Sequence, residues 1–438
     1  MMQTPRRFVG GAFCVLLAAA TGRFTIPPAT ASAQGAGELI VVARDVKIGM
    51  RTGAPLLARI FRPPGKTLRP AILSIETDTS AAREENARAL AAAGYAVVLA
   101  APRAGDLLDD KRTGRDGYDA IDWINDQPWS DRRIVMTGTG EGASAAWNTA
   151  REHPPKLVAI LARTPLRPLG WSPTDLSRLT IVSLSVTGAF FEQQGTAIGT
   201  YNEVVDAGGP ASSGAFIVIG SLSETAARLL EFEWFNYTLG SGNTPTLVRK
   251  RVNYMTAADS VWHAADSFSA IGAVATSFPL HTDAGPRAAP GGFLGGGAQD
   301  SESADTIPLN GKTYQTLLNA PMDIAGRATV TLWFAKGSAG KPQLSLEEVR
   351  RDSSAVLLGT SGGAKFVAPK ANPDAIAAVG APPTDETVER WDFGSFEWAA
   401  TRLAAGSFLR LTVRAPGAVL RHDVLRYSRL TVPVLKSR

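Results

Sequence analysis

A glycine stands where the surrounding residues are typical of a catalytic serine. Residues 133–147, RIVMTGTGEGASAAW, read as an apolar strand, a tight glycine-rich turn and a helix. This is the layout of a nucleophile elbow, Gly-x-Ser-x-Gly, in which a strained turn holds a serine above a sheet. Residues 138–142 read GTGEG, so Gly140 takes the serine position. Glycine carries no nucleophile, and it adopts a positive φ without the strain that serine would bear.

Strands and helices alternate around this turn. The expected strands are 70–75, 95–100, 134–137, 157–162, 179–186 and 215–219, after a hairpin over 46–62. The expected helices are 83–93, 116–125 and one that runs from the elbow to about residue 152. Such alternation favours a parallel or mostly parallel sheet with helical crossovers, which is the α/β class.

The composition changes after about Tyr254. Glycine, proline, serine and alanine become more frequent, and residues 283–304 read as a loop of this kind. Short alternating segments then predict strands at 329–335, 344–350, 408–413 and 425–432. No helical periodicity of any length occurs there, so we expect an all-β, jelly-roll-like sandwich.

The N-terminus has the features of an export signal. Arg6 and Arg7 precede an apolar run over residues 8–20, and Ala31-Ser32-Ala33 is a small-residue cleavage site. The expected organisation is therefore a signal peptide over residues 1–33, an α/β domain over 34–255 and a β-sandwich over 256–438. An export signal of this kind predicts a periplasmic or secreted protein, exported by either the Sec or the twin-arginine route.

Charge and cysteine content exclude several classes of protein. The chain of 438 residues is 45% hydrophobic and 19% charged, as is usual for a globular protein rather than a disordered or membrane-embedded one. Removing the three arginines of the leader from a formal net charge of +5 leaves +2, without a basic cluster. We therefore expect no nucleic-acid partner and no stable membrane insertion after cleavage. The only cysteine, Cys14, lies in the leader, so the mature chain has neither disulfides nor thiolate chemistry.

Several stretches together resemble a known family. They are MRTGAPLLARIFRPP (50–64), GYAVV (94–98), PRAG (102–105) and DGYDAIDWINDQPWSDRRIVMTGTGEG (116–142), followed by Trp147. These are similar to motifs of the X-Pro dipeptidyl-peptidases and cocaine esterases, which are serine hydrolases. The resemblance implies an α/β-hydrolase core joined to a C-terminal jelly-roll domain.

The active-site positions depart from that family. By resemblance, the nucleophile falls on Gly140, the acid on Phe191, the histidine on Glu224 and the oxyanion-hole tyrosine on Asp78. None of the four side chains that the family uses is present. Only 50 residues separate Gly140 from Phe191, so most of the family's helical cap is missing. The resemblance therefore implies a degenerate member that lacks the catalytic triad.

Other residues offer no clear replacement for the triad. Ser144 lies one turn into the helix, where we expect a small packing residue. The four histidines, His153, His263, His281 and His422, do not follow a core strand, where a general base would have to lie, and we expect structural roles for them. A dinucleotide-binding fingerprint is also matched by the glycine-rich turn, but the next strand, 156–163, ends in arginine rather than in an acid for the ribose.

Three carboxylates form the remaining candidate site. Asp78, Glu141 and Glu224 are all expected near the carboxyl ends of strands, where open α/β sheets bind ligands. Crowded like charges would raise at least one pKa or attract a cation; the alternative interpretation is three solvated loop acids. Metal-ligand spacing is absent, so we expect neither a metal nor a cofactor.

Two main hypotheses follow for function. The first is a non-catalytic binding or scaffolding protein whose candidate pocket contains Asp78, Gly140, Glu141 and Glu224, with an unidentified small molecule or protein as ligand. The alternative is an active hydrolase of ester or amide bonds that uses a non-standard site. A third possibility, a carbohydrate- or surface-binding sandwich, depends on fold analogy alone.

Overall fold

The computed structural model describes most of the chain beyond residue 39. The described residues are 40–78, 80–103, 110–166, 169–188, 194–240, 242–282, 291–295, 303–362, 364–365, 388–394, 396–422 and 428–436. The expected signal peptide lies outside them. One compact unit extends over Glu38–Arg438 and includes the expected boundary at residues 255–256, which stays a prediction.

A ten-stranded sheet occupies the first part of the chain, in the order β1-β2-β4-β3-β5-β6-β7-β8-β9-β10. The strands from β4 to β9 pair in parallel, and β1, β2 and β10 are antiparallel to their neighbours. The strands are β1 (Val41–Ile48), β2 (Leu56–Arg62), β3 (Arg69–Ile75), β4 (Ala96–Ala101), β5 (Ser130–Thr139), β6 (Leu157–Arg163), β7 (Val182–Thr187), β8 (Ala215–Ile219), β9 (Val252–Thr256) and β10 (Val261–Ala265).

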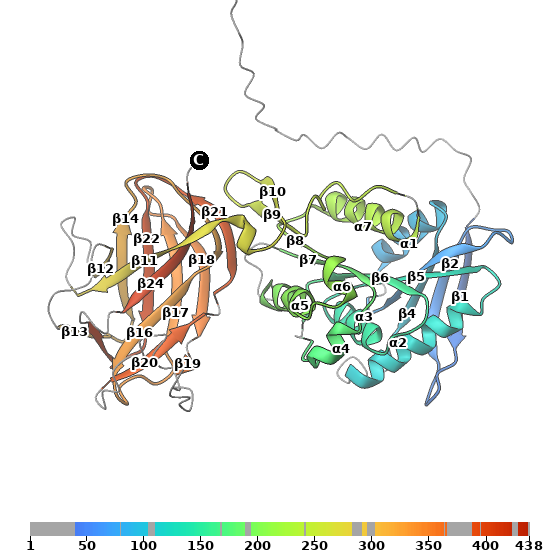
Figure 1. Ribbon diagram of the computed structural model, residues 1–438, viewed down its shortest axis with the longest axis horizontal. Coiled ribbons are helices and arrows are strands. Elements are labelled where there is room, and N and C mark those ends of the chain that lie inside the picture. Colours follow the sequence, from blue (N-terminus) through green and yellow to red (C-terminus); the bar gives the residue numbers. More distant parts are fainter. Residues whose placement is uncertain are drawn as a thin grey trace, which may run out of the picture. The chain divides into compact units, whose positions relative to one another are not determined.

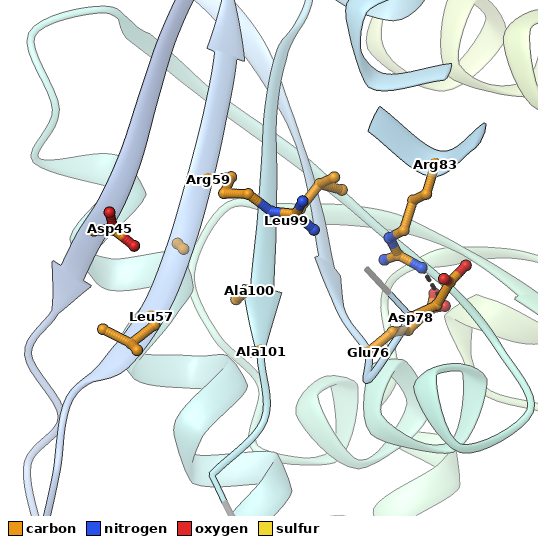
Figure 2. Close-up of a pocket in the computed structure, with 10 residues that line it drawn as sticks. Asp45, Leu57, Arg59, Glu76, Asp78, Arg83, Leu99, Ala100 and Ala101 are labelled. Carbon is orange, nitrogen blue, oxygen red and sulfur yellow. Dashed lines mark hydrogen bonds and ion pairs between the residues drawn. The ribbon is translucent and has the colours of Figure 1, made fainter. Parts of the chain in front are cut away.

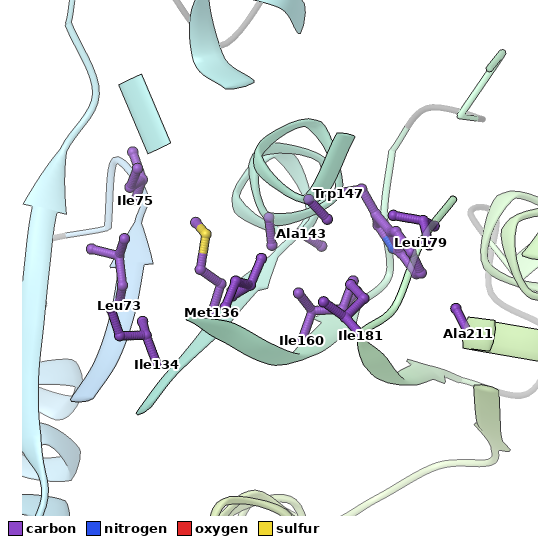
Figure 3. Packing of buried hydrophobic residues seen from close by; sticks show 14 of the residues in the cluster. Leu73, Ile75, Ile134, Met136, Ala143, Trp147, Ile160, Leu179, Ile181 and Ala211 are labelled. Carbon is purple, nitrogen blue, oxygen red and sulfur yellow. The ribbon is translucent and has the colours of Figure 1, made fainter. Parts of the chain in front are cut away.

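Helices cover both faces of this sheet (Figure 1). They are α1 (Ala81–Ala92), α2 (Asp110–Asn125), α3 (Glu141–Arg151), α4 (Pro173–Ser177), α5 (Gln194–Asp206), α6 (Pro210–Ser213) and α7 (Glu224–Leu239). Apolar residues of α1 and α7 share one buried cluster with one face of the sheet. Residues of α2, α3 and α5 share the cluster on the opposite face, where Trp147 packs near Leu179 and Ile181 (Figure 3).

Serine caps fix the starts of the two helices on the first face. The side chain of Ser80 accepts a hydrogen bond from the backbone N–H of Arg83 at 3.4 Å, and α1 begins at the next residue. Ser223 caps α7 in the same way, through the N–H of Ala226 at 3.2 Å. After α1, Gly94 takes a φ of 104°, which lets the chain leave the helix and enter β4. Both helices therefore start at the carboxyl edge of the sheet.

The second part of the chain is all-β except for the 3-10 turn Ser269–Ile271, among the residues described. The strands are β11 (Ala273–His281), β12 (Gly292–Leu294), β13 (Ser303–Thr306), β14 (Lys312–Leu317), β15 (Met322–Arg327), β16 (Thr329–Ala335), β17 (Gln343–Val349), β18 (Ala355–Gly362), β19 (Ala364–Lys365), β20 (Val388–Phe393), β21 (Trp398–Leu403), β22 (Phe408–Arg414), β23 (Val419–His422) and β24 (Arg429–Leu435). One buried cluster with Leu332, Phe334 and Leu411 forms its core.

Strand β11 joins the two layers of this β region. It pairs with β24 along most of its length and with β12 at its end, where Leu280 faces Leu294 in the register. The expected loop over residues 283–304 was wrong in part, because β12 lies within it and β13 begins before its end. Their pairing with β14 and β23 depends on distant strands, so local glycine-rich composition did not predict it.

Candidate functional site

The turn between β5 and α3 has the geometry of the expected elbow. Gly140 alone separates the end of β5 from the start of α3, with φ 59° and ψ −115°. Its N–H donates to the carbonyl of Arg163 at 2.9 Å, and its carbonyl accepts from the N–H of Ser144 at 3.2 Å. The predicted positive φ at Gly140 is confirmed.

Glycines on either side of the apex let the strand and helix approach closely. A Cβ at Gly138 would lie 2.2 Å from the carbonyl carbon of Gly142 and 2.6 Å from the nitrogen of Ala143. A Cβ at Gly142 would lie 2.1 Å from Cγ of Glu76. The elbow therefore excludes any side chain at Gly138, and Gly142 leaves room for the Glu76 side chain.

Space is not what demands glycine at the apex. A Cβ at Gly140 would meet only the Leu166 side chain, at 3.7 Å, which is an ordinary van der Waals contact. The backbone conformation is the constraint, because residues other than glycine rarely adopt it. Ser144 offers no replacement nucleophile, since it is buried in α3 and its hydroxyl donates to the Gly140 carbonyl at 3.4 Å.

A carboxylate lies beside the elbow, directly after β3. In folds with a nucleophile elbow, the loop after this strand supplies an N–H donor to the oxyanion hole. Here the Glu76 side chain accepts hydrogen bonds from the backbone N–H of Thr139 at 3.2 Å and from the Ser74 hydroxyl at 2.9 Å. Arg83 forms an ion pair with the same carboxylate, which is 11% exposed. An arginine–carboxylate ion pair thus lies beside the elbow (Figure 2).

A pocket of about 510 Å³ opens at the carboxyl ends of the strands. Its lining comes from the loop after β3, the elbow, the end of β6 and the first turns of α1, α3 and α7. We call it the strand-end pocket; it is lined by Glu76, Thr77, Asp78, Ser80, Ala82, Arg83, Thr139, Glu141, Gly142, Arg163, Glu224, Ala227 and Arg228. Three helix N-termini therefore face one cavity, and the peptide dipoles there favour negative charge.

The structure brings the three predicted carboxylates to this pocket. The pKa of Asp78 is lowered, first by the backbone N–H of Ser80, which donates to its carboxylate at 2.8 Å, and further by the Ser80 hydroxyl and the charges of Arg83 and Arg59. The surroundings therefore lower the pKa of Asp78, and the expectation that crowding raises at least one of the three pKa values stays a prediction. Among the described residues, no group of three or more His, Cys, Asp or Glu side chains could hold a metal ion.

Sequence reasoning missed the arginines of the strand-end pocket. Arg83, Arg163 and Arg228 line it together with the acids. Their ion-pair partners are Glu76, Glu231 and Glu224 respectively. Arg163 was visible as the last residue of a strand, but its partner is 68 positions away along the chain, on α7. Residues so far apart in the sequence give no local pattern from which their ion pair could be predicted.

The remaining predicted residues lie elsewhere or outside the described residues. Gly140 does not line the strand-end pocket, although both its neighbours do. Phe191 falls outside the described residues. His263 stacks on Tyr254, and His281 bonds the carbonyl of Gly295 at 2.9 Å. His153 follows the C-terminal end of α3, and nothing is described of the side chain of His422. In the described ranges, no helix has the length and apolarity to cross a bilayer.

Comparison with known proteins finds a family match for part of the chain. Residues 52–175 match the family model described as X-Pro dipeptidyl-peptidase (S15 family). The expected resemblance is confirmed. The S15 match begins in the turn between β1 and β2, includes the elbow and ends inside α4. No curated protein sequence matches the chain.

Solved structures extend the likeness over nearly the whole chain. A CocE/NonD family hydrolase from Staphylococcus aureus superposes with a TM-score of 0.70 at 14% identity, covering 90% of this chain and 94% of its own. An aminopeptidase from a marine sediment Thaumarchaeota archaeon gives 0.67 at 13% identity, covering 91% and 97%. An α-amino acid ester hydrolase gives 0.67 at 13% identity, covering 94% and 99%.

These matches confirm the fold class. The chain has an α/β-hydrolase core followed by a β-strand-rich sandwich. Between β6 and β7, where a cap would be inserted, the described residues contain only the short helix α4. The strand-end pocket therefore has little covering it on that side, among the residues described.

Proposed function

We propose that this protein is an exported, non-catalytic relative of the S15-family hydrolases that binds a ligand in the strand-end pocket. The observation that carries the proposal is Gly140 at the apex of an otherwise complete elbow. Acyl transfer at this turn needs a hydroxyl nucleophile there, with a base within hydrogen-bond reach. Gly140 supplies no nucleophile, and His153, His263 and His281 do not line the pocket.

The charge beside the elbow supports the same proposal. A hydrolase stabilises the negative charge that develops on the substrate oxygen, using donors aimed at it. The Glu76 carboxylate already takes the Thr139 N–H and the Arg83 guanidinium. A substrate oxyanion at this place would find these two donors already bound to a carboxylate.

One observation favours the alternative, an active hydrolase with a non-standard site. The hydroxyl of Ser80 lines the strand-end pocket and donates to the Asp78 carboxylate at 3.2 Å. The same oxygen caps α1 by accepting the Arg83 N–H. Because the hydroxyl is engaged on both sides and lacks an imidazole, it is poorly placed to act as a nucleophile.

The decisive experiment measures turnover by residues 34–438. Short-chain p-nitrophenyl esters and X-Pro dipeptide amides should be hydrolysed no faster than by the Gly140→Ala and Ser80→Ala variants. Reproducible turnover that one pocket substitution abolishes would contradict the non-catalytic proposal. A thermal-shift panel of metabolites tests binding, because a ligand raises stability even without turnover.

Export is tested separately. It depends on the sequence of the leader, with cleavage proposed after Ala33. N-terminal sequencing of protein recovered from the periplasm or medium should begin at Gln34. Recovery of uncleaved chain from the cytoplasm alone would contradict this part of the proposal.

A further inference from the structure

Strand β21 has one face in each of two hydrophobic cores. Trp398 and Ala400 belong to the buried cluster that also covers one face of the ten-stranded sheet, whereas Ala399 and Leu403 belong to the cluster of the β region. Successive side chains of a strand point to opposite faces, so this alternation places β21 between the two cores. The outward face of an antiparallel sheet is commonly solvated, but at β21 it is apolar and covered. The β region is therefore packed onto the ten-stranded sheet within one folded unit.

The side chain of Trp398 makes aromatic contacts across this boundary. It is 4% exposed, and its ring meets Tyr254 of β9 edge-on at a centroid distance of 5.3 Å and Phe268 at 6.1 Å. A backbone hydrogen bond joins the same two parts, from the N–H of Ala257 to the carbonyl of Ala400 at 2.8 Å. Because edge-to-face aromatic pairs have a preferred geometry, the Trp398 ring fixes the orientation of β21 as well as its position.

A buried glutamine binds the backbone of the same tryptophan. Gln194, the first residue of α5, is 0% exposed. Its side-chain oxygen accepts from the N–H of Trp398 at 2.7 Å, and its side-chain nitrogen donates to the Trp398 carbonyl at 2.9 Å. The amide thus pairs with Trp398 as a neighbouring strand would. Because a buried amide without partners is costly, Gln194 and β21 have to move together.

The same amide is bonded to the end of β7, which leads to the strand-end pocket. The Gln194 nitrogen also donates to the carbonyl of Gly188 at 3.3 Å. The preceding carbonyl, of Thr187, accepts from the N–H of Gly220 at 2.9 Å. Gly220 leads into Ser223, which caps α7, and the first turn of α7 lines the strand-end pocket. A short series of hydrogen bonds and one helix cap therefore connect the Gln194 amide to the pocket wall.

Close packing supplies a second connection between Trp398 and Gly220. Met255 follows Tyr254 on β9, and a Cβ at Gly220 would lie 2.8 Å from the Met255 Cβ and 2.8 Å from the Trp262 ring. The end of β8 is thus packed against the hairpin β9–β10 without room for a methyl group. Since close-packed interiors transmit strain, a displacement of Tyr254 by Trp398 would also move Gly220.

We propose that β21 and Gln194 form a coupling element between the β region and the strand-end pocket. Gln194 is a positioning residue in this arrangement, because it holds the strand ends from which the first turn of α7 starts. A ligand or partner that shifts β21 changes the affinity of the pocket, and a ligand in the pocket stabilises β21 in turn, since such coupling is reciprocal. The proposal deepens the proposed function and rests on it only for the role of the pocket as a binding site.

Hydrogen–deuterium exchange of residues 34–438, read by mass spectrometry, tests this coupling without any ligand. Gln194→Met removes both hydrogen bonds to Trp398 and keeps the length of the side chain. The rate of amide exchange should rise about tenfold or more at residues 398–403, where the bonds are lost. The coupling predicts a rise of similar size at residues 219–228, which Gln194 does not touch. Exchange in β3 should stay as in the parent.

Two further variants complete the test. Gln127→Met is the matched control, because the Gln127 side chain also donates to a backbone carbonyl, that of Trp123 at 3.0 Å, but lies between α2 and β5. It should leave exchange at residues 219–228 and 398–403 unchanged. Trp398→Phe keeps the backbone bonds to Gln194 and shortens the ring that packs on Tyr254. It should raise exchange at residues 219–228 through the packing contact, and it serves as the test if Gln194→Met does not fold.

Two results would overturn the proposal. If exchange rises at residues 398–403 while residues 219–228 stay as in the parent, the contacts of β21 are local and the coupling is refuted. If exchange rises equally in β3, the variants lose stability throughout the protein and no specific coupling exists. Neither result affects the turnover and thermal-shift assays, which decide the proposed function by themselves.

Discussion

Replacing Gly140 with serine restores the elbow motif and should yield a less stable, inactive protein. The built Cβ lies 3.7 Å from Leu166, so the steric contribution to the change in unfolding free energy is close to zero. The cost comes from the backbone, because serine would have to hold φ 59° and ψ −115°. A residue kept in such a sparsely populated region costs about 1–3 kcal/mol.

Urea unfolding followed by tryptophan fluorescence measures this loss, and Gly170→Ser is the matched control. Gly170 also has φ 59°, and a Cβ there would meet nothing within 4 Å. Because serine would have to hold a positive φ at both positions, both variants should be less stable than the parent. A Gly140→Ser protein as stable as the parent would refute the argument that conformation demands glycine at the apex.

Esterase activity of Gly140→Ser gives the second readout. Members of a catalytic unit act together, so restoring one of them restores little. We expect no turnover above the Gly140→Ala variant with short acyl esters. If activity appears, a functional base survives, and Asp78 or Glu224 becomes the first residue to replace.

Three further predictions follow from the site. Gly138→Ala should cost more than Gly140→Ser in urea unfolding, because its Cβ would lie 2.2 Å from backbone of Gly142; equal midpoints would contradict this. Arg163→Met should cost on the order of 3 kcal/mol, since Glu231 is only 8% exposed and loses its cation; adding Glu231→Leu should recover most of the loss, and no recovery would refute the assignment. The pKa of Asp78 is lowered in the folded state, so its contribution to stability is complete above the unfolded pKa near 3.8 and is lost as the pH falls through the folded value. Asp78→Asn should therefore destabilise at pH 6, and the difference in unfolding free energy from the parent should shrink as the pH falls below 3.8; a difference that does not shrink would contradict this reasoning.

The fold was predictable where the local pattern carried the information. The segment 329–335 matches β16 at both ends, and the apolar run 95–100 matches β4 to within one residue. The start of α2 was not predicted, because Asp110–Arg115 is polar and contains Gly114. A Cβ at Gly114 would lie 2.6 Å from the carbonyl oxygen of Asn148, so tertiary packing selects this glycine. Helix propensity alone argues against it.

The candidate site was predictable in position but not in charge. We expected Asp78, Glu141 and Glu224 to lie together, because each follows a strand of one parallel sheet and these strands end at the same edge. It did not give the pairs that connect Arg83 to Glu76 and Arg163 to Glu231, because those depend on how α1 and α7 lie across the sheet. An expectation built on the acids alone therefore left out the guanidinium groups that lie among them.

Glu76 sets the order in which any attempt to rebuild an enzyme on this scaffold must proceed. Two negative charges about 4 Å apart repel by about 4 kcal/mol at an effective dielectric constant of 20. At the elbow the Arg83 guanidinium offsets most of that repulsion, and the repulsion would return if Arg83 were replaced alone. Replacing Glu76 alone would leave the Arg83 guanidinium and the Thr139 N–H without their acceptor. A designer would therefore replace Glu76 and Arg83 together, as a pair, and only then introduce the nucleophile.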